Sequence, residues 1–431
     1  MVGRLRAPFF LPMIARALLS AFLMLPSGSA PKASEATASV GLREGPLGAA
    51  SSLRAFLPDT VLTPPGGPAI VFLTSPSPGV TALRLSVPLV EGPTEAGAGR
   101  LLELLARERM RGLAAPVGAR VWSSRTPWGI AYTVEGAEAD FEYLAYLLRQ
   151  AVAEPRVEDP SFTRARRRLE EELARSRETP GAAIEAMLRR RIEPEAPPPG
   201  GTEVSLAALD AARTLEVWRR SHQASGMTLV VATSLPAEVV LAATRGVGAP
   251  EEDAAPPLDA PLPAPRTSSR PETLRSWLGL GYRMGPPTDP ATAVVAKLLA
   301  DRLRTVVRGY EARVELWEAA DAHILAITGA GYRRARGAMR RTLGNLVPQA
   351  RRELDAERVR RAVARVRRDL LFGARTPAGL VAAVGRARDA TGEPQAAAGY
   401  LSSLESVGVI QVRAVLEAMT EQPPIRVEIE P

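Results

Sequence analysis

The chain has 431 residues, of which 46% are hydrophobic, 24% are charged and 5% are aromatic, and its formal net charge is +8. This composition excludes a disordered chain, a collagen-like fibre and a disulfide-linked scaffold. There is no cysteine, which excludes thiol chemistry, and two histidines, His222 and His323, leave little room for most zinc or Ser–His sites. Arginines at 166–168 are followed by glutamates at 170–172, and this interleaving indicates a solvated helix face rather than a nucleic-acid-binding stripe.

The N-terminal segment has the features of a secretory signal peptide. Arg4 and Arg6 precede an apolar run at 9–25, and small residues follow at 27–30. This order of basic, apolar and small residues predicts a signal peptide at 1–30, with an uncleaved membrane anchor as the alternative. No later segment has about 18 uninterrupted apolar residues. We therefore expect a bacterial periplasmic or secreted protein that has no membrane partner after signal removal.

The next part of the chain, 53–245, predicts alternating strands and helices. Leu83, Leu85 and Val87 recur at every second position, which is typical of a half-buried strand. A hairpin is expected further on, turning at Ser124-Arg125-Thr126. The strands expected in this part are 69–73, 80–89, 117–123, 127–134 and 228–233, and the helices are 94–111, 141–152 and 162–175.

A stretch rich in proline, alanine and acidic residues at 246–271 predicts a linker, because it cannot hold a helix or a central strand. Similar elements recur after it, and the breakers Arg177-Glu178-Thr179-Pro180 and Ala374-Arg375-Thr376-Pro377 occupy matching places. Strands are expected at 277–282, 312–318, 323–328 and 425–430, and helices at 291–307, 333–346 and 359–371. We therefore predict two homologous α+β domains, 53–245 and 272–431, each a mostly antiparallel sheet packed with helices.

One helix start carries a resemblance to a known family. After the strand at 83–89 come Gly92 and then Gly97-Ala98-Gly99-Arg100-Leu101-Leu102-Glu103-Leu104. A strand, a glycine and a helix in this order resemble the M16 (insulinase-type, pitrilysin-like) metallopeptidases in their two-domain form. Their helix carries the zinc motif His-x-x-Glu-His. The proline-rich linker and the closing strand also fit, so the resemblance covers residues 53–431.

The resemblance implies that the zinc site is degenerate. In the family, two histidines one helical turn apart and a carboxylate from a later helix bind zinc, and the glutamate acts as base. Here the histidine positions hold Arg100 and Leu104, neither of which can bind a metal, and only Glu103 is kept. Without a catalytic role, Glu103 is expected on the helix surface, paired with Arg100 or Arg107. Candidates for the third ligand remain at Glu171, Glu172 and Glu178. We expect no metal, no cofactor and no catalytic residue.

The resemblance also implies a role for the second half. In M16 proteins of this size a zinc-free chain often pairs with a zinc-bearing one and supplies an arginine and a tyrosine that position the peptide. The matching residues are Arg302, Arg308 and Tyr310. A guanidinium and a phenol can donate hydrogen bonds to a peptide carbonyl. The alternatives are a helix-surface salt bridge for Arg302 and a half-buried loop ring for Tyr310.

Three functional hypotheses follow. The first is a catalytically inert M16-like subunit that forms a heterodimer with a zinc-bearing M16 peptidase and helps position an extended peptide or unfolded polypeptide along a sheet edge. The second is a non-enzymatic homodimer that binds peptides or acts as a scaffold. The third is an active zinc metalloendopeptidase with unusual ligands, which would have to recruit His222 or His323.

Overall fold

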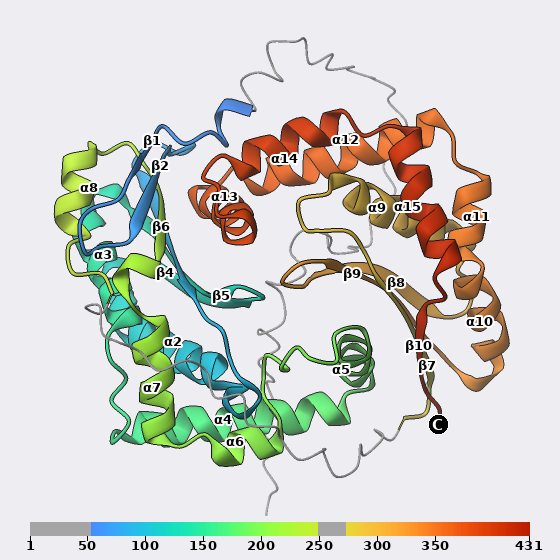
Figure 1. Cartoon of the computed structure of the whole chain (residues 1–431), viewed down its shortest axis with the longest axis horizontal. Coiled ribbons are helices and arrows are strands. Elements are labelled where there is room, and N and C mark those ends of the chain that lie inside the picture. Colours follow the sequence, from blue (N-terminus) through green and yellow to red (C-terminus); the bar gives the residue numbers. More distant parts are fainter. Residues whose placement is uncertain (1–52, 249–272) are drawn as a thin grey trace, which may run out of the picture.

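Two β-sheets organise the chain in the computed structural model, which describes residues 53–248 and 273–431 (Figure 1). The expected signal peptide and nearly all of the expected linker lie outside these residues. The first sheet has six strands in the order β1-β2-β6-β3-β5-β4, and every neighbouring pair is antiparallel except β2 and β6. Its strands are β1 (Thr60–Leu62), β2 (Ala69–Thr74), β3 (Val80–Pro88), β4 (Arg120–Thr126), β5 (Gly129–Ala137) and β6 (Thr228–Thr233).

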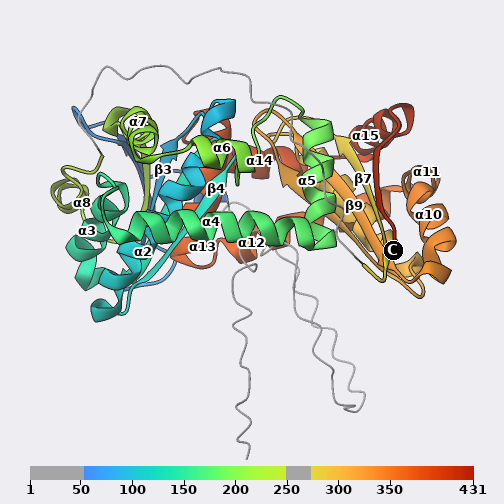
Figure 2. The same ribbon diagram turned by 90° about the horizontal axis from the view of Figure 1, so that it is seen from below.

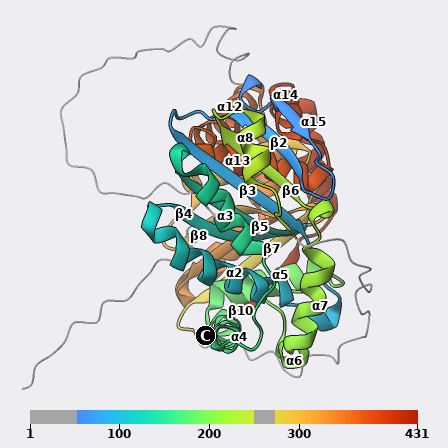
Figure 3. The ribbon, with the colours of Figure 1, turned by 90° about the vertical axis from the view of Figure 1, so that its left-hand side faces the viewer.

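Helices of the first half cover one face of this sheet, as the side view shows (Figure 3). Leu83, Leu85 and Val87 of β3 are buried on that face, as their alternation predicts, and α2 and α3 pack over it. Gly97 starts α2 in the left-handed region at φ 98°, which a residue with a side chain rarely adopts. The helices of this half are α2 (Ala98–Ala114), α3 (Phe141–Val152), α4 (Pro160–Glu178), α5 (Pro180–Ile192), α6 (Glu203–Ala208), α7 (Ala211–Ser221) and α8 (Ala237–Ala243).

The second sheet is fully antiparallel, with the order β10-β7-β9-β8. Its strands are β7 (Ser276–Arg283), β8 (Glu311–Glu318), β9 (His323–Gly331) and β10 (Ile425–Ile429). The helices of this half are α9 (Pro290–Val306), α10 (Arg336–Gly344), α11 (Leu346–Arg352), α12 (Ala356–Gly373), α13 (Pro377–Thr391), α14 (Ala396–Glu405) and α15 (Val409–Glu421). Both halves therefore pass through a similar order of elements.

Each sheet is nevertheless covered by a helix from the other half. Helix α5 packs against β7 and β10, where Gly279 and Gly281 leave room for Ile184 and Leu188. Helix α13 packs against β3 and β6 of the first sheet, and Figure 1 shows it beside that sheet, among helices of the second half. Figure 2 shows α4 running beneath both halves on its way to α5. The chain is thus a single α+β unit with one mixed and one antiparallel sheet, and the prediction of two homologous domains was wrong.

A buried ion pair links the two halves where α13, a helix of the second half, covers the first sheet. We call this mutual covering of the sheets by α5 and α13 the exchange. Arg84, on β3, donates a hydrogen bond of 2.7 Å to Asp389, on α13, and both side chains are buried. Gly385 makes the contact possible, because a Cβ at that position would lie 2.2 Å from the Arg84 guanidinium. Two apolar faces that would otherwise face solvent are therefore buried only when both halves are folded together.

Most predicted elements are present, but the first hairpin is shifted. Strands β4 and β5 turn at Pro127-Trp128 rather than at Ser124-Arg125-Thr126. Gly129 follows with φ 154°, and a Cβ there would meet the Val87 carbonyl oxygen at 2.0 Å. The proline and the glycine together favour the later turn. In the part of the chain that the structure describes, no helix is both long and apolar enough to cross a membrane.

Candidate functional site

Two glutamates converge on one arginine at the start of α2. The Arg100 guanidinium donates a hydrogen bond of 2.7 Å from Nη1 to Glu103 Oε2 and bonds of 3.1 and 2.9 Å from Nε and Nη2 to Glu172 Oε2. Arg100 and Glu103 are one helical turn apart, and Glu172 comes from α4, which packs against α2. We call these three residues the Arg100 cluster.

The carboxylate of Glu103 lies inside the protein. Glu103 is 1% exposed, and its second oxygen accepts a hydrogen bond of 2.9 Å from Ser123 Oγ on β4. The predicted ion pair with Arg100 is present, but the predicted surface position was wrong, because this side of α2 faces the sheet. Ser123 and Tyr132 are directly paired across β4 and β5, so both point toward α2.

The hydroxyl of Tyr132 lies near this cluster and has no hydrogen-bond partner among the described residues. Burial, reinforced by the negative charge of Glu103, raises the pKa of Tyr132. The phenol therefore stays protonated, and its O–H donor has no acceptor among the described residues. Burial alone would lower the pKa of Arg100, but Glu103 and Glu172 outweigh that effect and raise it. Arg100 is thus a permanent cation.

The residues present do not fit zinc. Glu103 and Glu172 already neutralise Arg100, and Leu104, the position one turn after Arg100, is buried in the apolar core. Of the other two candidate carboxylates, Glu171 pairs with Arg167 on the exposed side of α4, and Glu178 is exposed at its end. Within residues 53–248 and 273–431, no three His, Asp or Glu side chains come together as metal ligands.

Both histidines are buried at other places. His222 ends α7, stacks on Trp218 and lies 2.8 Å through Nδ1 from Ser221 Oγ. Burial lowers its pKa to about 3. His323 begins β9, where burial lowers its pKa to about 4 although Asp289 opposes the shift. Neither histidine makes a hydrogen bond or ion pair with Glu103 or Glu172 in the described structure.

The three residues predicted to position a peptide have separate surroundings. Arg302, on α9, donates to Glu353 and, over 2.9 Å, to Gln349 of α11. Arg308 is exposed and donates to the Val307 carbonyl. The Tyr310 hydroxyl is buried without a hydrogen-bond partner in the described residues. No hydrogen bond or ion pair joins any two of the three in that part of the chain.

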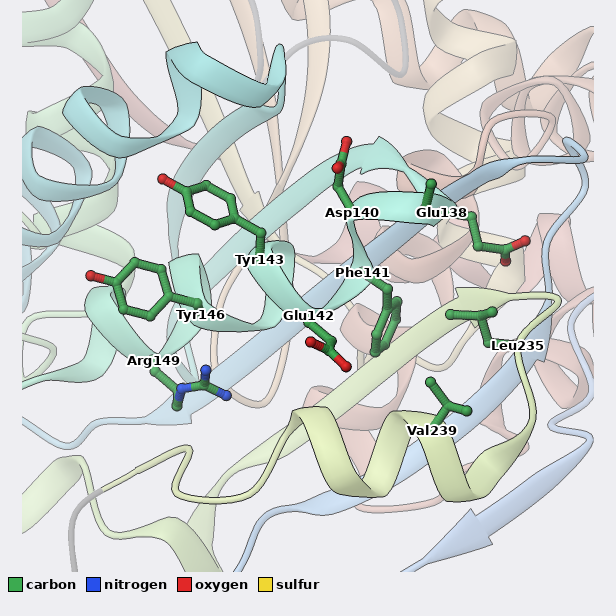
Figure 4. A pocket seen from close by; sticks show the side chains of 10 residues that line it. Glu138, Asp140, Phe141, Glu142, Tyr143, Tyr146, Arg149, Leu235 and Val239 are labelled. Atoms are coloured by element: carbon green, nitrogen blue, oxygen red, sulfur yellow. The ribbon is translucent and has the colours of Figure 1, made fainter.

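A shallow hollow of about 630 Å³ lies apart from these residues, between the start of α3 and α8 (Figure 4). Tyr143 and Tyr146 line one side of α3, and Leu235 and Val239 lie on the other (Figure 4). Two of its charged side chains are held by the protein. Glu138 accepts hydrogen bonds from Thr233 and Ser234, and Arg149 donates to the Ala243 carbonyl. Asp140 and Glu142 are its remaining carboxylates, and its described lining holds no histidine, lysine or serine that could act with them as a base or nucleophile.

The sequence predicted a peptide-binding sheet edge without identifying the strand, and the structure places β4 at an outer edge of the first sheet. This strand ends the first sheet and pairs with β5 alone among the described residues. Unpaired backbone groups of an edge strand can hold an added strand. Neither proline nor glycine interrupts β4, whose sequence is Arg-Val-Trp-Ser-Ser-Arg-Thr. A predicted strand without proline or glycine can pair along its whole length, and this was the signal that the sequence offered. The order of strands in the sheet, which decides whether β4 lies at an edge, cannot be obtained from one strand.

Comparison with known proteins identifies the fold. No protein-family model and no curated protein sequence matches the chain. A protease from Helicobacter pylori has a TM-score of 0.73 and 15% identity, with 87% of this chain and 100% of that one covered. A peptidase M16 inactive domain from Pseudomonas fluorescens has a TM-score of 0.70 and 14% identity, with coverages of 86% and 97%. The periplasmic protease PqqL from Escherichia coli has a TM-score of 0.65 and 14% identity, covering 86% of this chain and 45% of PqqL.

Proposed function

We propose that this chain, which has an M16 peptidase-like fold, is a catalytically inert subunit that pairs with a zinc-bearing M16 peptidase and helps hold extended peptide. The observation that carries the proposal is the Arg100 cluster. Arg100 and Leu104 stand at the two positions where the family motif has histidines, and Glu103 stands at the position of its base. The guanidinium supplies the positive charge that Glu103 and Glu172 require. Helices α2 and α4 are therefore linked at this point without a metal.

The remaining carboxylates argue against the hypothesis of an active enzyme with unusual ligands. Zinc in catalytic sites has three protein ligands and an open position for water. Glu103 and Glu172 would be two oxygen ligands, and Arg100 lies between them. Both histidines would have to leave buried positions to contribute. We therefore derive no catalytic step through a metal in this chain.

Pairing and compartment are parts of the same proposal. A bacterial periplasmic or secreted location rests on the N-terminal signal sequence, and the heterodimer rests on the likeness to M16 folds, one of them described as an inactive domain. Arg308 is the exposed member of the three predicted peptide-positioning residues. It can reach a peptide without breaking a salt bridge, whereas Arg302 would have to exchange Glu353 for the peptide.

The open edge of β4 supports a second candidate function, a non-enzymatic homodimer that binds extended peptides. Backbone pairing with an added strand needs no metal and no partner enzyme. The two candidates agree on peptide binding and differ in the partner: a zinc-bearing peptidase in the first and a second copy of this chain in the second.

The test uses the chain without residues 1–30, alone and mixed with a zinc-bearing M16 peptidase from the same genome. We expect no bound zinc and no peptidase activity from the chain alone, a one-to-one complex in the mixture, and faster cleavage of a quenched peptide by the complex. Arg308→Ala should reduce that gain, and Arg304→Ala, a change at an exposed arginine paired with Asp301, is the matched control. One zinc per chain together with activity of the chain alone would overturn the proposal.

A further inference from the structure

The edge strand β4 presents different side chains on its two faces. Val121, Ser123 and Arg125 point toward α2, where Ser123 donates to Glu103 and Arg125 donates to Glu91 over 2.7 Å. Ser123 and Arg125 are therefore held by buried carboxylates, and the Nε and Nη1 atoms of Arg125, which have no partner among the described residues, are buried as well. Side chains of β4 that are free to recognise a ligand therefore lie on the other face of the strand. Arg120 and Trp122 are on that face.

Arg120 brings an accessible positive charge to that face. Its side chain is 79% exposed, and one N–H lies 3.3 Å from Glu135, the residue directly opposite on β5. Glu135 is itself largely buried and also accepts a hydrogen bond from the Ala378 N–H of α13. Most of the five guanidinium donors of Arg120 remain free. Arg120 also lines a hollow of about 330 Å³ next to Thr376 and Pro377.

Trp122 lies two residues further along the same face. Trp122 is partly buried and packs against the large apolar core to which β3, β6 and α13 contribute. A side chain on an added strand directly opposite Trp122 would lie about 5 Å away between Cβ atoms, within reach of the ring. Aromatic and β-branched side chains are the favourable partners of an aromatic residue in such cross-strand pairs.

We infer that the edge of β4 selects extended peptides in which an acidic side chain and an aromatic or β-branched side chain are two residues apart, opposite Arg120 and Trp122. This inference rests on the proposed binding of peptide along the β4 edge. The spacing of two follows from the strand period, because only alternate residues of the peptide face the same side as Arg120 and Trp122.

The inference is tested with short fluorescein-labelled peptides of equal length in a Ser/Thr background, by fluorescence anisotropy. One peptide carries Glu-x-Phe, a second carries adjacent Glu-Phe, a third carries Lys-x-Phe and a fourth carries Glu-x-Ser. We expect the first to bind most tightly and each of the others to bind about threefold to fivefold more weakly, the ratio that one favourable cross-strand pair produces. Arg120→Glu should reverse the preference between Glu-x-Phe and Lys-x-Phe.

Two controls keep the result interpretable. Arg167→Glu reverses a charge that is as exposed as Arg120, at 80%, but lies on α4, and it should leave all four affinities unchanged. Trp122→Ala should remove the preference for Phe over Ser. Since Trp122 is partly buried and this variant can lose stability, the exposed Arg120→Glu variant carries the test if Trp122→Ala does not fold.

Backbone N-methylation of the peptide separates the two ways of failing. If N-methylation weakens binding and all four peptides bind equally well, the edge is a peptide site and the proposed side-chain preference is wrong. If no peptide binds, or N-methylation has no effect, peptide binding along β4 is itself wrong. A dimer of this chain that Arg120→Glu dissociates, and with which no peptide competes, would overturn the inference in favour of a second copy at this edge.

Discussion

Replacing Arg100 by methionine should destabilise the protein strongly. The substitution removes the cation but keeps a long apolar stem over α2. Glu103, 1% exposed, would retain only Ser123 as a hydrogen-bond partner, and only the attraction of Arg107, with which it forms no hydrogen bond, would offset its buried charge. Breaking a buried ion pair in this way costs about 3–5 kcal/mol. Because the Arg100 side chain is still 23% exposed, we expect a loss near the lower end, about 3 kcal/mol.

The measurement is urea unfolding followed by tryptophan fluorescence and circular dichroism, with Arg167→Met as the matched control. Arg167 is 80% exposed and its partner Glu171 is 55% exposed, so that change should cost less than about 1 kcal/mol. Adding Glu103→Gln to Arg100→Met should recover much of the lost stability, because a neutral amide leaves no uncompensated buried charge.

Two results would refute this reasoning. If Arg100→Met costs no more than Arg167→Met, Glu103 does not depend on the guanidinium and the buried pair contributes little. If Glu103→Gln fails to recover stability in the Arg100→Met background, the loss comes from the lost packing of the arginine stem. It does not then come from the buried negative charge that Glu103 keeps when Arg100 is removed.

Three further predictions concern metal, pH and the contact between the halves. The double substitution Arg100→His and Leu104→His should create a site that binds one zinc per chain, measured by metal analysis after dialysis, and the single Arg100→His variant should not; absence of zinc in the double variant would contradict the proposed match to the family motif. Between pH 7 and pH 5, His222 and His323 should each remove about 2 kcal/mol of stability, because their folded pKa values of about 3 and about 4 lie below the usual value and the unfolded chain therefore takes up protons first. A double His→Gln variant should flatten this pH dependence, and an unchanged slope in chemical unfolding would show that other groups cause it. Arg84→Met should leave a buried carboxylate of α13 unpaired and destabilise both halves by about 3 kcal/mol or more, seen as loss of hydrogen-exchange protection in both sheets; a loss confined to one half would contradict the interlocked fold.

Local patterns were enough to predict the elements and the fold class. Three kinds of signal each act over a few residues. They are the alternation in β3, the aspartate and proline at the start of α4, and the Thr-Pro pairs at the starts of α5 and α13. Thr179 and Thr376 stand just before a proline that begins the next helix, a position that favours helix initiation. Such signals are independent of the rest of the chain, so the sequence alone reveals them.

Long-range contacts explain what could not be predicted. Glu103 was predicted at the surface because its helix carries charges at many positions. It is buried because α2 packs against β4, a contact between elements that are separate in the sequence. The pairing of Arg100 with Glu172 joins residues on different helices, which the spacing along one helix does not specify. The exchange of α5 and α13 depends on which apolar face of each sheet lacks a cover within its own half.

That exchange also has a consequence for the order of synthesis. Apolar residues of β3 and β6, the strands against which α13 packs, such as Ala82 and Val230, emerge from the ribosome long before α13 is made. At about 5–20 residues per second, the first sheet waits about 8–30 seconds for its covering helix. During that interval its uncovered apolar face is a binding surface for chaperones and a starting point for aggregation. The first half of this protein is therefore expected to remain dependent on holding factors until almost the whole chain has been made and, if it is exported as proposed, has crossed the membrane.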